Sequence, residues 1–245
     1  EAEGKNFLID GGSSAKSKVG QDKIIPALKA LGSSELDAII ITHGDQDHMS
    51  GIPELLSFHE KGGGIWIRQI LLPNLPVQSE EGCNELANLA LKARIPVSYI
   101  KKGDRLCSEE MELVCLNPDK TTDLEDSNSA SIALFMEYKE FQALFTGDIT
   151  GEGESKMVKE LKKMKESGKN VSLDYLKVAH HGSQSSTPEE LLKLTNPKAA
   201  FISAGENNSY GHPHKELLDR LNQIDCMIFT TSEYGQISVI TDGKK

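Results

Sequence analysis

The stretch THGDQDHMSG, residues 42–51, puts four potential metal ligands within six positions, namely His43, Asp45, Asp47 and His48. It overlaps the end of DAIIIT (37–42), an apolar run that predicts a buried strand. Ligands of α/β folds tend to lie at the carboxyl ends of strands. An acidic turn would account for the two aspartates but not for both histidines. We therefore expect a metal-binding loop, with His43 and Asp45 at one ion and Asp47 and His48 at a second.

Further ionisable residues lie at the ends of other apolar runs, each near a glycine. Asp10 follows NFLI, Asp148 ends FQALFTGD, His180 and His181 follow DYLKVA, and His212 and His214 lie in YGHPH after KAAFISAGENN. Together with the first cluster, these motifs contain six of the seven histidines, and only His59 lies outside them. Surface histidines placed at random would scatter along the chain. The pattern therefore favours one shared site.

Strand-like and helix-like segments alternate along the chain, which predicts an α/β fold with two sheets and helices on their outer faces. Strands are predicted at 6–10, 37–42, 65–72, 97–100, 111–116, 131–138, 141–147, 174–179, 198–204, 226–231 and 236–241. Helices are predicted at 23–31, 52–60, 84–94, 154–167 and 215–224, and after a capping box that begins at Thr187. No segment has the composition of a linker, so we expect a single domain.

The overall composition narrows the class of function. The net charge is −10, which argues against a broad basic face of the kind that holds duplex DNA. The four cysteines form no CxxC pair, and we interpret them mainly as small buried residues, with one disulfide still open. No apolar run approaches the roughly 20 residues that span a bilayer, so the chain as given is predicted to be soluble.

Four motifs in the same order, THGDQDHMSG, LFTGDI (144–149), VAHHGS (178–183) and SAGENNSYGHPH (203–214), resemble the metallo-β-lactamase superfamily. More narrowly, they are similar to the C-terminal domain of ComEC-type channel proteins, which take up DNA in competence. The resemblance covers nearly the whole chain. It implies an αββα four-layer sandwich, with residues 1–245 as one metallo-β-lactamase-like domain.

By position, the resemblance implies a two-metal site. His43 and Asp45 would serve the first ion, and Asp47, His48 and His180 the second, with His181 beside His180. Asp148 would bridge the two ions. Asp10 would hold the cluster loop as an outer carboxylate, as such groups commonly orient ligating histidines.

The chain departs from the superfamily pattern in two ways. Asp45 stands where a histidine is usual, and a further ligand histidine is replaced by DSNSASIAL, so that Asn128, Ser129 or Ser131 would line the first site. Oxygen ligands suit harder ions, which makes Mn²⁺ or Mg²⁺ plausible beside Zn²⁺. ComEC-like domains also open with a strand reading roughly DVGQGD, which does not precede Glu1. The resemblance thus implies that a first strand is missing and that the chain is a piece of a larger membrane protein.

The resemblance implies a metal-dependent nuclease or phosphodiesterase that acts on DNA during uptake. Asp47 and Asp148 would be essential, and His212 would donate a proton to the leaving oxygen or hold a phosphate. Ser183 and Asn208 would bind phosphate oxygens, and His214 would support a metal ligand or contact the substrate. The alternative for His214 is a purely structural residue at a helix terminus. The domain would be tethered to the cytoplasmic membrane on its extracytoplasmic side, next to the channel portion of its parent protein. Two alternatives stay open: a hydrolase of small phosphodiesters or esters, and a non-catalytic, metal-stabilised docking domain.

Overall fold

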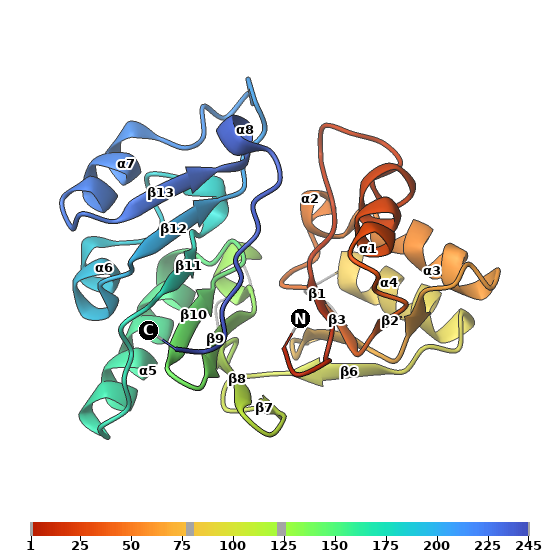
Figure 1. The fold of residues 1–245 in the computed structure, drawn as a ribbon, viewed down its shortest axis with the longest axis horizontal. Helices are drawn as coiled ribbons and strands as arrows, with labels where there is room; N and C mark the ends of the chain where they lie inside the picture. Colours follow the sequence, from red (N-terminus) through yellow and green to blue (C-terminus); the bar gives the residue numbers. More distant parts are fainter. Residues whose placement is uncertain (1, 77–80, 122–125, 245) are drawn as a thin grey trace. The chain divides into compact units, whose positions relative to one another are not determined.

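The computed structural model describes residues 2–76, 81–121 and 126–244 (Figure 1). The chain divides into two compact units, Glu1–Ile100 and Lys101–Lys245. Each unit has its own sheet, its own covering helices and its own hydrophobic core. Both units are therefore α/β, as the alternation of segments predicts.

The first unit contains a parallel sheet of four strands. In spatial order they are β1 (Phe7–Ile9), β3 (Ala38–Ile40), β5 (Ile70–Pro73) and β6 (Val97–Ile100). A second, smaller parallel pair joins β2 (Glu35–Leu36) to β4 (Trp66–Ile67). Strands β3 and β5 are buried along their whole length, which explains why their sequences are continuous apolar runs rather than alternating ones.

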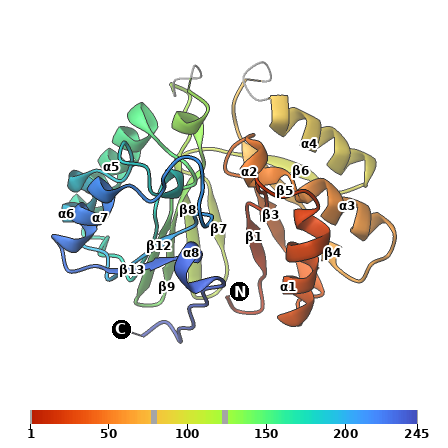
Figure 2. The same ribbon diagram turned by 90° about the horizontal axis from the view of Figure 1, so that it is seen from above.

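Helices cover one face of this sheet (Figure 2). The helical segments are the π-helical turn η1 (Gly20–Ile24), α1 (Ile25–Ala30), α2 (Gln46–Met49), α3 (Ile52–Glu60) and α4 (Glu81–Lys92). Leu28 of α1, Leu55 of α3 and Leu86 of α4 pack with Ile39 and Ile70 of the sheet in one core. The short helix α2 follows the carboxyl end of β3 and carries Asp47 and His48, two of the four potential metal ligands of this loop.

The second unit contains a mixed sheet of seven strands. In spatial order they are β13 (Met227–Thr230), β12 (Ala199–Ile202), β11 (Tyr175–Lys177), β10 (Phe141–Phe145), β9 (Ala133–Tyr138), β8 (Met111–Asn117) and β7 (Arg105–Cys107). Strands β7 to β10 pair antiparallel, and β10 to β13 pair parallel. The parallel half brings the carboxyl ends of β10, β11 and β12 to one edge of this sheet.

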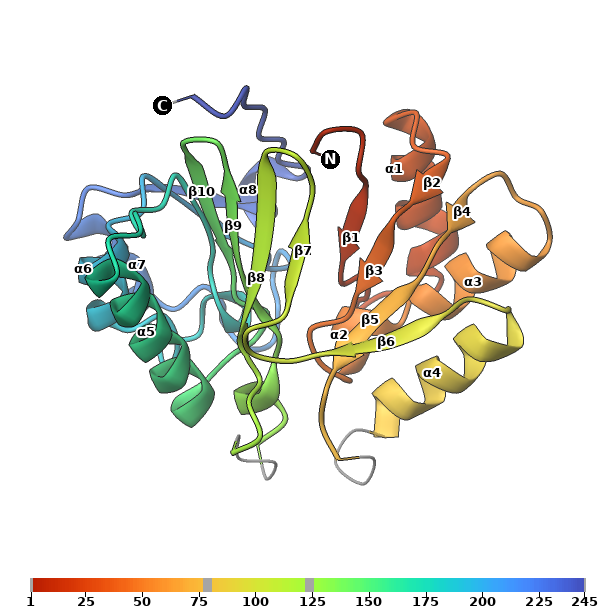
Figure 3. The same cartoon turned by 90° about the horizontal axis from the view of Figure 1, so that it is seen from below.

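Three helices lie on one face of the second sheet (Figure 3). The helical segments of this unit are η2 (Asn128–Ala130), α5 (Gly151–Glu166), η3 (His180–Gly182), α6 (Glu189–Thr195), α7 (Lys215–Asn222) and α8 (Thr231–Tyr234). Leu161 of α5, Leu192 of α6 and Leu217 of α7 share a core with Leu144 and Leu176 of the strands. The helices predicted at 52–60, 84–94, 154–167 and 215–224 correspond to α3, α4, α5 and α7.

Two strand predictions differ from the structure. Residues 65–72 form two strands rather than one, because β4 pairs with β2 while β5 pairs with β3. Residues 236–241 form no strand at all. Gly235, at φ 67°, turns the chain after α8, and Val239 and Ile240 are exposed rather than paired with a neighbouring strand. The alternating pattern of this segment was therefore a misleading signal.

The predicted capping box at Thr187 is also wrong. Helix α6 begins at Glu189 with Pro188 as its N-cap residue, and no side chain caps it. The Thr187 Oγ1 instead accepts a hydrogen bond from the Ala179 N–H at 3.3 Å. This hydroxyl thus belongs to the loop before the helix and not to the helix itself.

Gly153, in the first turn of α5, allows a close approach to η2. Its N–H donates to the Ser129 Oγ at 2.9 Å, and a Cβ at this position would collide with the Ser129 carbonyl. We expect Gly153→Ala to lower the free energy of unfolding by about 1–3 kcal/mol, because both backbones would have to shift. Gly205→Ala is the control, since its Cβ would meet open space. Equal unfolding midpoints in urea for the two variants would contradict this packing.

Candidate metal centre

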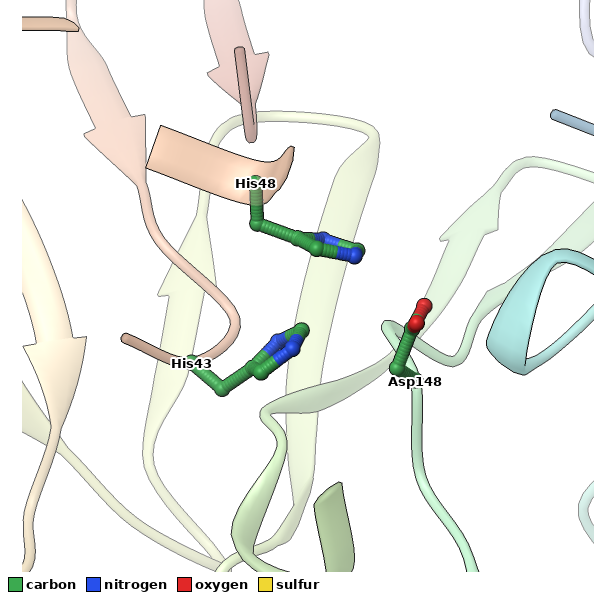
Figure 4. A group of neighbouring side chains, drawn as sticks. All are labelled: His43, His48 and Asp148. Carbon is green, nitrogen blue, oxygen red and sulfur yellow. The ribbon is translucent and has the colours of Figure 1, made fainter. Parts of the chain in front are cut away.

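The loop after β3 gathers two histidines and a carboxylate. His43 and His48 are almost fully buried, and their ring centroids lie 4.1 Å apart (Figure 4). Asp45, which is half-exposed, directly precedes α2 and places its Oδ2 3.5 Å from the His43 Nε2. The pKa of Asp45 is lowered, chiefly by the neighbouring His43 side chain. This part of the predicted site is thus assembled within the first unit, and Asp47 lies beside it in α2.

The carboxylate of Asp10, at the end of β1, holds this loop. Its Oδ1 accepts the Thr42 N–H at 2.8 Å, and its Oδ2 accepts both the Thr42 hydroxyl and the His48 Nδ1–H, each at 2.8 Å. The Thr42 hydroxyl has one hydrogen, which goes to Asp10, so the His43 Nδ1, 3.0 Å from Thr42 Oγ1, must be the donor in that pair. Both rings are therefore assigned the tautomer in which Nε2 is the ring nitrogen with a lone pair for a ligand.

This arrangement fits a metal centre. Ligating histidines commonly donate their other N–H to a carboxylate or another outer acceptor, which fixes the ring orientation. Asp10 does so directly for His48, and through Thr42 for His43. The role of Asp10 as an outer carboxylate stays a prediction, and it would use these contacts.

Two glycines after Asp10 let its strand approach α2. The Gly11 N–H donates to the His48 carbonyl at 2.6 Å, and the Gly51 N–H donates to the Gly11 carbonyl at 2.9 Å. A Cβ on Gly12 would lie too close to the backbone of α2. Only glycine tolerates this approach, so the sequence DGG supports the cluster loop in addition to ending a strand.

In the second unit, Asp148 lies in the turn after β10 and is buried (Figure 4). The His181 Nε2 lies 3.2 Å from the Asp148 Oδ2, and the His181 Nδ1–H donates to the Ser203 carbonyl at 2.7 Å. His181 therefore uses its Nδ1–H for the backbone and directs its Nε2 at Asp148. The structure brings His181, which the sequence argument placed only beside the ligands, to the predicted bridging carboxylate.

Lys177 is a residue that the sequence argument missed. Its Nζ donates to the Gly147 carbonyl at 2.8 Å and lies 3.5 Å from the Asp148 Oδ1. The lysine thus holds the turn that presents Asp148. A charged residue within the otherwise apolar run DYLKVA was the signal that could have identified it.

Three further histidines, His180, His212 and His214, form a row in the second unit. The His180 ring lies 5.8 Å from that of His212, which lies 4.7 Å from that of His214. The pKa of His212 is lowered, first by burial and then by the neighbouring His214, His180 and His181. His212 is therefore mainly neutral at pH 7.

His214 has a structural role. Its Nδ1 accepts the Gln184 N–H at 3.0 Å, and its Nε2–H donates to the Tyr210 carbonyl at 3.1 Å. These two bonds connect the loop that carries His181 to the loop that carries His212. His214 also immediately precedes α7, which agrees with its predicted place near a helix terminus.

The predicted phosphate ligands are engaged in the loops that carry them. The Asn208 Nδ2 donates to the Gly205 and His212 carbonyls, and its Oδ1 accepts the His212 N–H at 2.9 Å. The Ser183 Oγ, which is largely buried, lies 3.0 Å from the Ser185 Oγ. Asn208 therefore shapes the backbone around His212.

The turn at 128–131, which the sequence predicts to line the first site, holds buried oxygens without a hydrogen-bond partner among the described residues. The Asn128 Oδ1 and Ser131 Oγ are buried and have no hydrogen-bond partner among the described residues, and the same holds for the Asn117 Oδ1. Asn117 is tied to this turn, because its Nδ2 donates to the Ser129 and Ser131 carbonyls at 2.9 and 2.8 Å. Buried oxygens of this kind call for a water or a hard cation.

A cavity of about 460 Å³ opens beside His212. It is lined by seven residues of the segment 205–213 and by three residues further along the chain, namely Thr230, Ser232 and Glu233. Its carboxylates, Glu206 and Glu233, make it unfavourable for a phosphate group. The cavity suits a neutral or cationic portion of a ligand.

Residues 1–64 match the model of the metallo-β-lactamase superfamily. The chain is 34% identical over 219 residues to ComE operon protein 3 of Bacillus subtilis, with 89% of this chain and 26% of that relative covered. It is 25% identical over 239 residues to competence protein ComA of Neisseria gonorrhoeae, with 95% of this chain and 29% of that relative covered. The chain thus spans a little over a quarter of the length of these relatives.

The sequence of the chain is thus similar to the metallo-β-lactamase superfamily. Its fold agrees, because the metallo-β-lactamase fold protein YhfI of Bacillus subtilis aligns with a TM-score of 0.59 at 14% identity, over 91% of this chain and 83% of YhfI. The fold class predicted from the sequence, α/β of the metallo-β-lactamase type, is therefore confirmed, as is the resemblance to competence proteins. Among the described residues, no helix is both long and apolar enough to cross a bilayer.

We expect Asp10→Ala to weaken Zn²⁺ binding about 10- to 100-fold in this metallo-β-lactamase-like chain, because it releases Thr42 and the His48 ring. Isothermal titration calorimetry would measure the loss. Asp37→Ala is the matched control, since Asp37 also accepts a backbone N–H, from Asn6 at 2.9 Å, but lies at the other end of β3. An equal loss of affinity in both variants would show that the effect is not specific to Asp10.

Proposed function

We propose that the chain is a metal-dependent phosphodiesterase that cleaves DNA during natural competence. The similarity to competence proteins over nearly the whole chain carries this proposal. The tautomers that Asp10 imposes on His43 and His48 support the metal requirement, because both rings present Nε2. The parent protein would then contain the membrane channel and hold this domain on the extracytoplasmic side of the membrane.

The proposed ligands come from the loop after β3 in the first unit, and from the turn after β10 and the loop after β11 in the second. His43 and Asp45 would hold the first ion, Asp47, His48 and the His180–His181 pair the second, and Asp148 would bridge them. Within the pair, His181 is the stronger candidate, because its Nε2 is directed at Asp148. When bound, two such ions supply an activated water and neutralise charge on a phosphoryl oxygen.

The first ion would have an unusually oxygen-rich set of ligands. Asp45 would stand where a histidine is usual, and Asn128 and Ser131 would contribute buried oxygens that have no hydrogen-bond partner among the described residues. Hard ions prefer such donors, so we propose that Mn²⁺ or Mg²⁺ fills this site more readily than Zn²⁺. The second site, richer in imidazole, would also bind Zn²⁺.

The chain's own residues would position the substrate. The neutral His212 ring can donate one N–H to a phosphoryl oxygen, and Asn208 orients that ring by holding its backbone. The acidic cavity beside His212 would receive a sugar or base of the leaving strand rather than a phosphate. Ser183 would act through the loop that it stabilises.

We expect Asp148→Ala and Asp47→Ala each to abolish cleavage of single-stranded DNA in Mn²⁺ while the circular dichroism spectrum stays unchanged. Loss of a carboxylate ligand would disperse the ions and remove several kcal/mol of transition-state stabilisation. Asp174→Asn is the control, because Asp174 also borders a strand of the second sheet, where it accepts the Gln142 N–H, but at the opposite end of β11. Cleavage at the wild-type rate by a folded Asp148→Ala protein would overturn the proposal.

We expect His212→Ala to lower DNA turnover about 10²- to 10³-fold, as the loss of a donor to a developing oxyanion does. A p-nitrophenyl phosphodiester separates this role from general acid catalysis, because its leaving group needs no proton. The defect should persist on that substrate if His212 binds a phosphoryl oxygen, and vanish if it protonates the leaving oxygen. His59→Ala, in α3, is the control and should keep wild-type turnover.

A small phosphodiester is the second candidate substrate. The net charge of −10 and the carboxylates of the cavity favour it, because long nucleic acids usually bind along a basic track. Comparing kcat/KM for an oligonucleotide and for a small phosphodiester, both in Mn²⁺, distinguishes the two. A higher kcat/KM for the small ester at both low and high salt concentration would favour this second candidate.

A further inference from the structure

The loop from Ala179 to Thr187, which carries His180 and His181, has an unusual backbone. His180, His181 and Thr187 have φ of 49°, 53° and 55°, and Gly182 has φ of 90°. Residues with a side chain are strained in this left-handed region and keep it only when their surroundings enforce it. The surroundings of this loop must therefore supply that constraint.

Two charged side chains from different helices hold the loop. From the first turn of α5, the buried Glu154 accepts the Thr187 N–H on its Oε1 at 2.6 Å. From α7, the Arg220 Nη2 donates to the Gln184 carbonyl at 3.1 Å and to the Ser186 carbonyl at 2.8 Å. The carboxylate thus satisfies an N–H of the loop, and the guanidinium satisfies two of its carbonyls.

These anchors connect directly to the residue before the histidines. The Thr187 Oγ1 accepts the Ala179 N–H at 3.3 Å, and the Ser186 Oγ donates to the Ala179 carbonyl at 3.0 Å. Displacement of Thr187 would release the Ala179 N–H. Displacement of Ser186 would remove one of the two donors to the Ala179 carbonyl, the other being the Gly182 N–H at 3.1 Å. The backbone that directly precedes His180 and His181 would then be held less firmly.

The position of Glu154 carries a cost that helix formation alone does not explain. Burial raises the pKa of Glu154 to about 7, although the Thr187 N–H and Arg220 lower it. An exposed glutamate in the first turn of a helix would avoid that cost and still interact favourably with the helix dipole. The carboxylate is therefore better explained by its contact with the loop.

We propose that Glu154 and Arg220 are positioning residues, which act through Thr187, Ser186 and Ala179 to hold His180 and His181 in the conformation that binds metal. The link to metal binding rests on the function proposed above, whereas the link to the loop conformation does not. Glu154 contacts the loop at Thr187, and Arg220 contacts it at Gln184 and Ser186. Their effect should therefore be on affinity and loop order rather than on chemistry.

The test compares Glu154→Leu and Glu154→Gln in the full chain. Amide hydrogen exchange of the metal-free protein would be read at Ala179 and Thr187, and Zn²⁺ affinity by calorimetry. In Glu154→Leu, we expect both amides to exchange about tenfold faster or more, because the Thr187 N–H loses its acceptor. We also expect Zn²⁺ affinity to fall about 10- to 100-fold, with unchanged exchange in β10 and β12.

Glu154→Gln should restore both properties, because the amide oxygen can still accept the Thr187 N–H. Glu166→Leu, an exposed position on the same helix, is the matched control and should change neither. Arg220→Lys provides a second variant should Glu154→Leu fail to fold. It keeps the charge but not the planar fork, and should also speed exchange at Ala179 and weaken Zn²⁺ binding.

Wild-type exchange at Ala179 and Thr187 in the folded Glu154→Leu and Arg220→Lys proteins would overturn the proposal. So would a loosened loop that binds Zn²⁺ with wild-type affinity, a result that would leave the proposed hydrolase intact. Failure of the wild-type protein to bind any divalent metal would instead refute the proposed function and the metal-binding part of this proposal. The exchange rates would still decide whether the two residues hold the loop.

Discussion

A single carboxylate, that of Asp10, sets the geometry of the cluster in the first unit. Parallel pairing of β1 with β3 places Ile9 opposite Ile40, and the Asp10 N–H then donates to the Ile40 carbonyl at 2.9 Å. This register brings the Asp10 side chain to Thr42, where it accepts the Thr42 N–H and hydroxyl. Asp10 also accepts the His48 Nδ1–H, so it sets the tautomer of His48 directly and that of His43 through Thr42. The segment with Asp10 and the segment with His43 and His48, more than thirty residues apart in sequence, thus together orient the two imidazole rings.

The second unit uses charged groups in the same way. Lys177 holds the turn that presents Asp148, while Glu154 and Arg220 hold the strained loop that presents His180 and His181. In both units the apolar strands determine where a loop begins, and a charged side chain from a neighbouring element determines its conformation. Burying such groups is costly unless they are hydrogen-bonded, which explains why each has specific partners.

The fold could be predicted from the sequence where burial leaves a strong pattern. Runs such as DAIIIT and FQALFTG gave strands with the polar residues at their carboxyl ends, because buried parallel strands need continuous apolar sequence. The pattern failed at 236–241, where the sequence alternates but the segment forms no strand. It also failed at Thr187, whose hydroxyl accepts the Ala179 N–H instead of capping α6. Pairing partners and tertiary hydrogen bonds are not encoded in local periodicity.

The candidate site was predictable in its residue types but not in their bonding. The motifs identified Asp10, His43, His48 and Asp148, whereas the contact of His181 with Asp148 depends on left-handed backbone that the letters HHGS do not reveal. Asn208, predicted to hold phosphate, has its amide engaged with the backbone around His212. Lys177, Glu154 and Arg220 were missed because each acts through backbone groups distant in sequence.

The proposed phosphodiesterase activity depends on divalent metal ions held by these residues. It can be tested by measuring the rate of DNA cleavage by chelator-treated protein as Mn²⁺ is added in known molar ratios. We expect no cleavage without metal and a rate that rises until two equivalents are bound. Cleavage that persists in excess chelator, or saturating Mn²⁺ binding with no cleavage of DNA or of a small phosphodiester, would contradict the proposal.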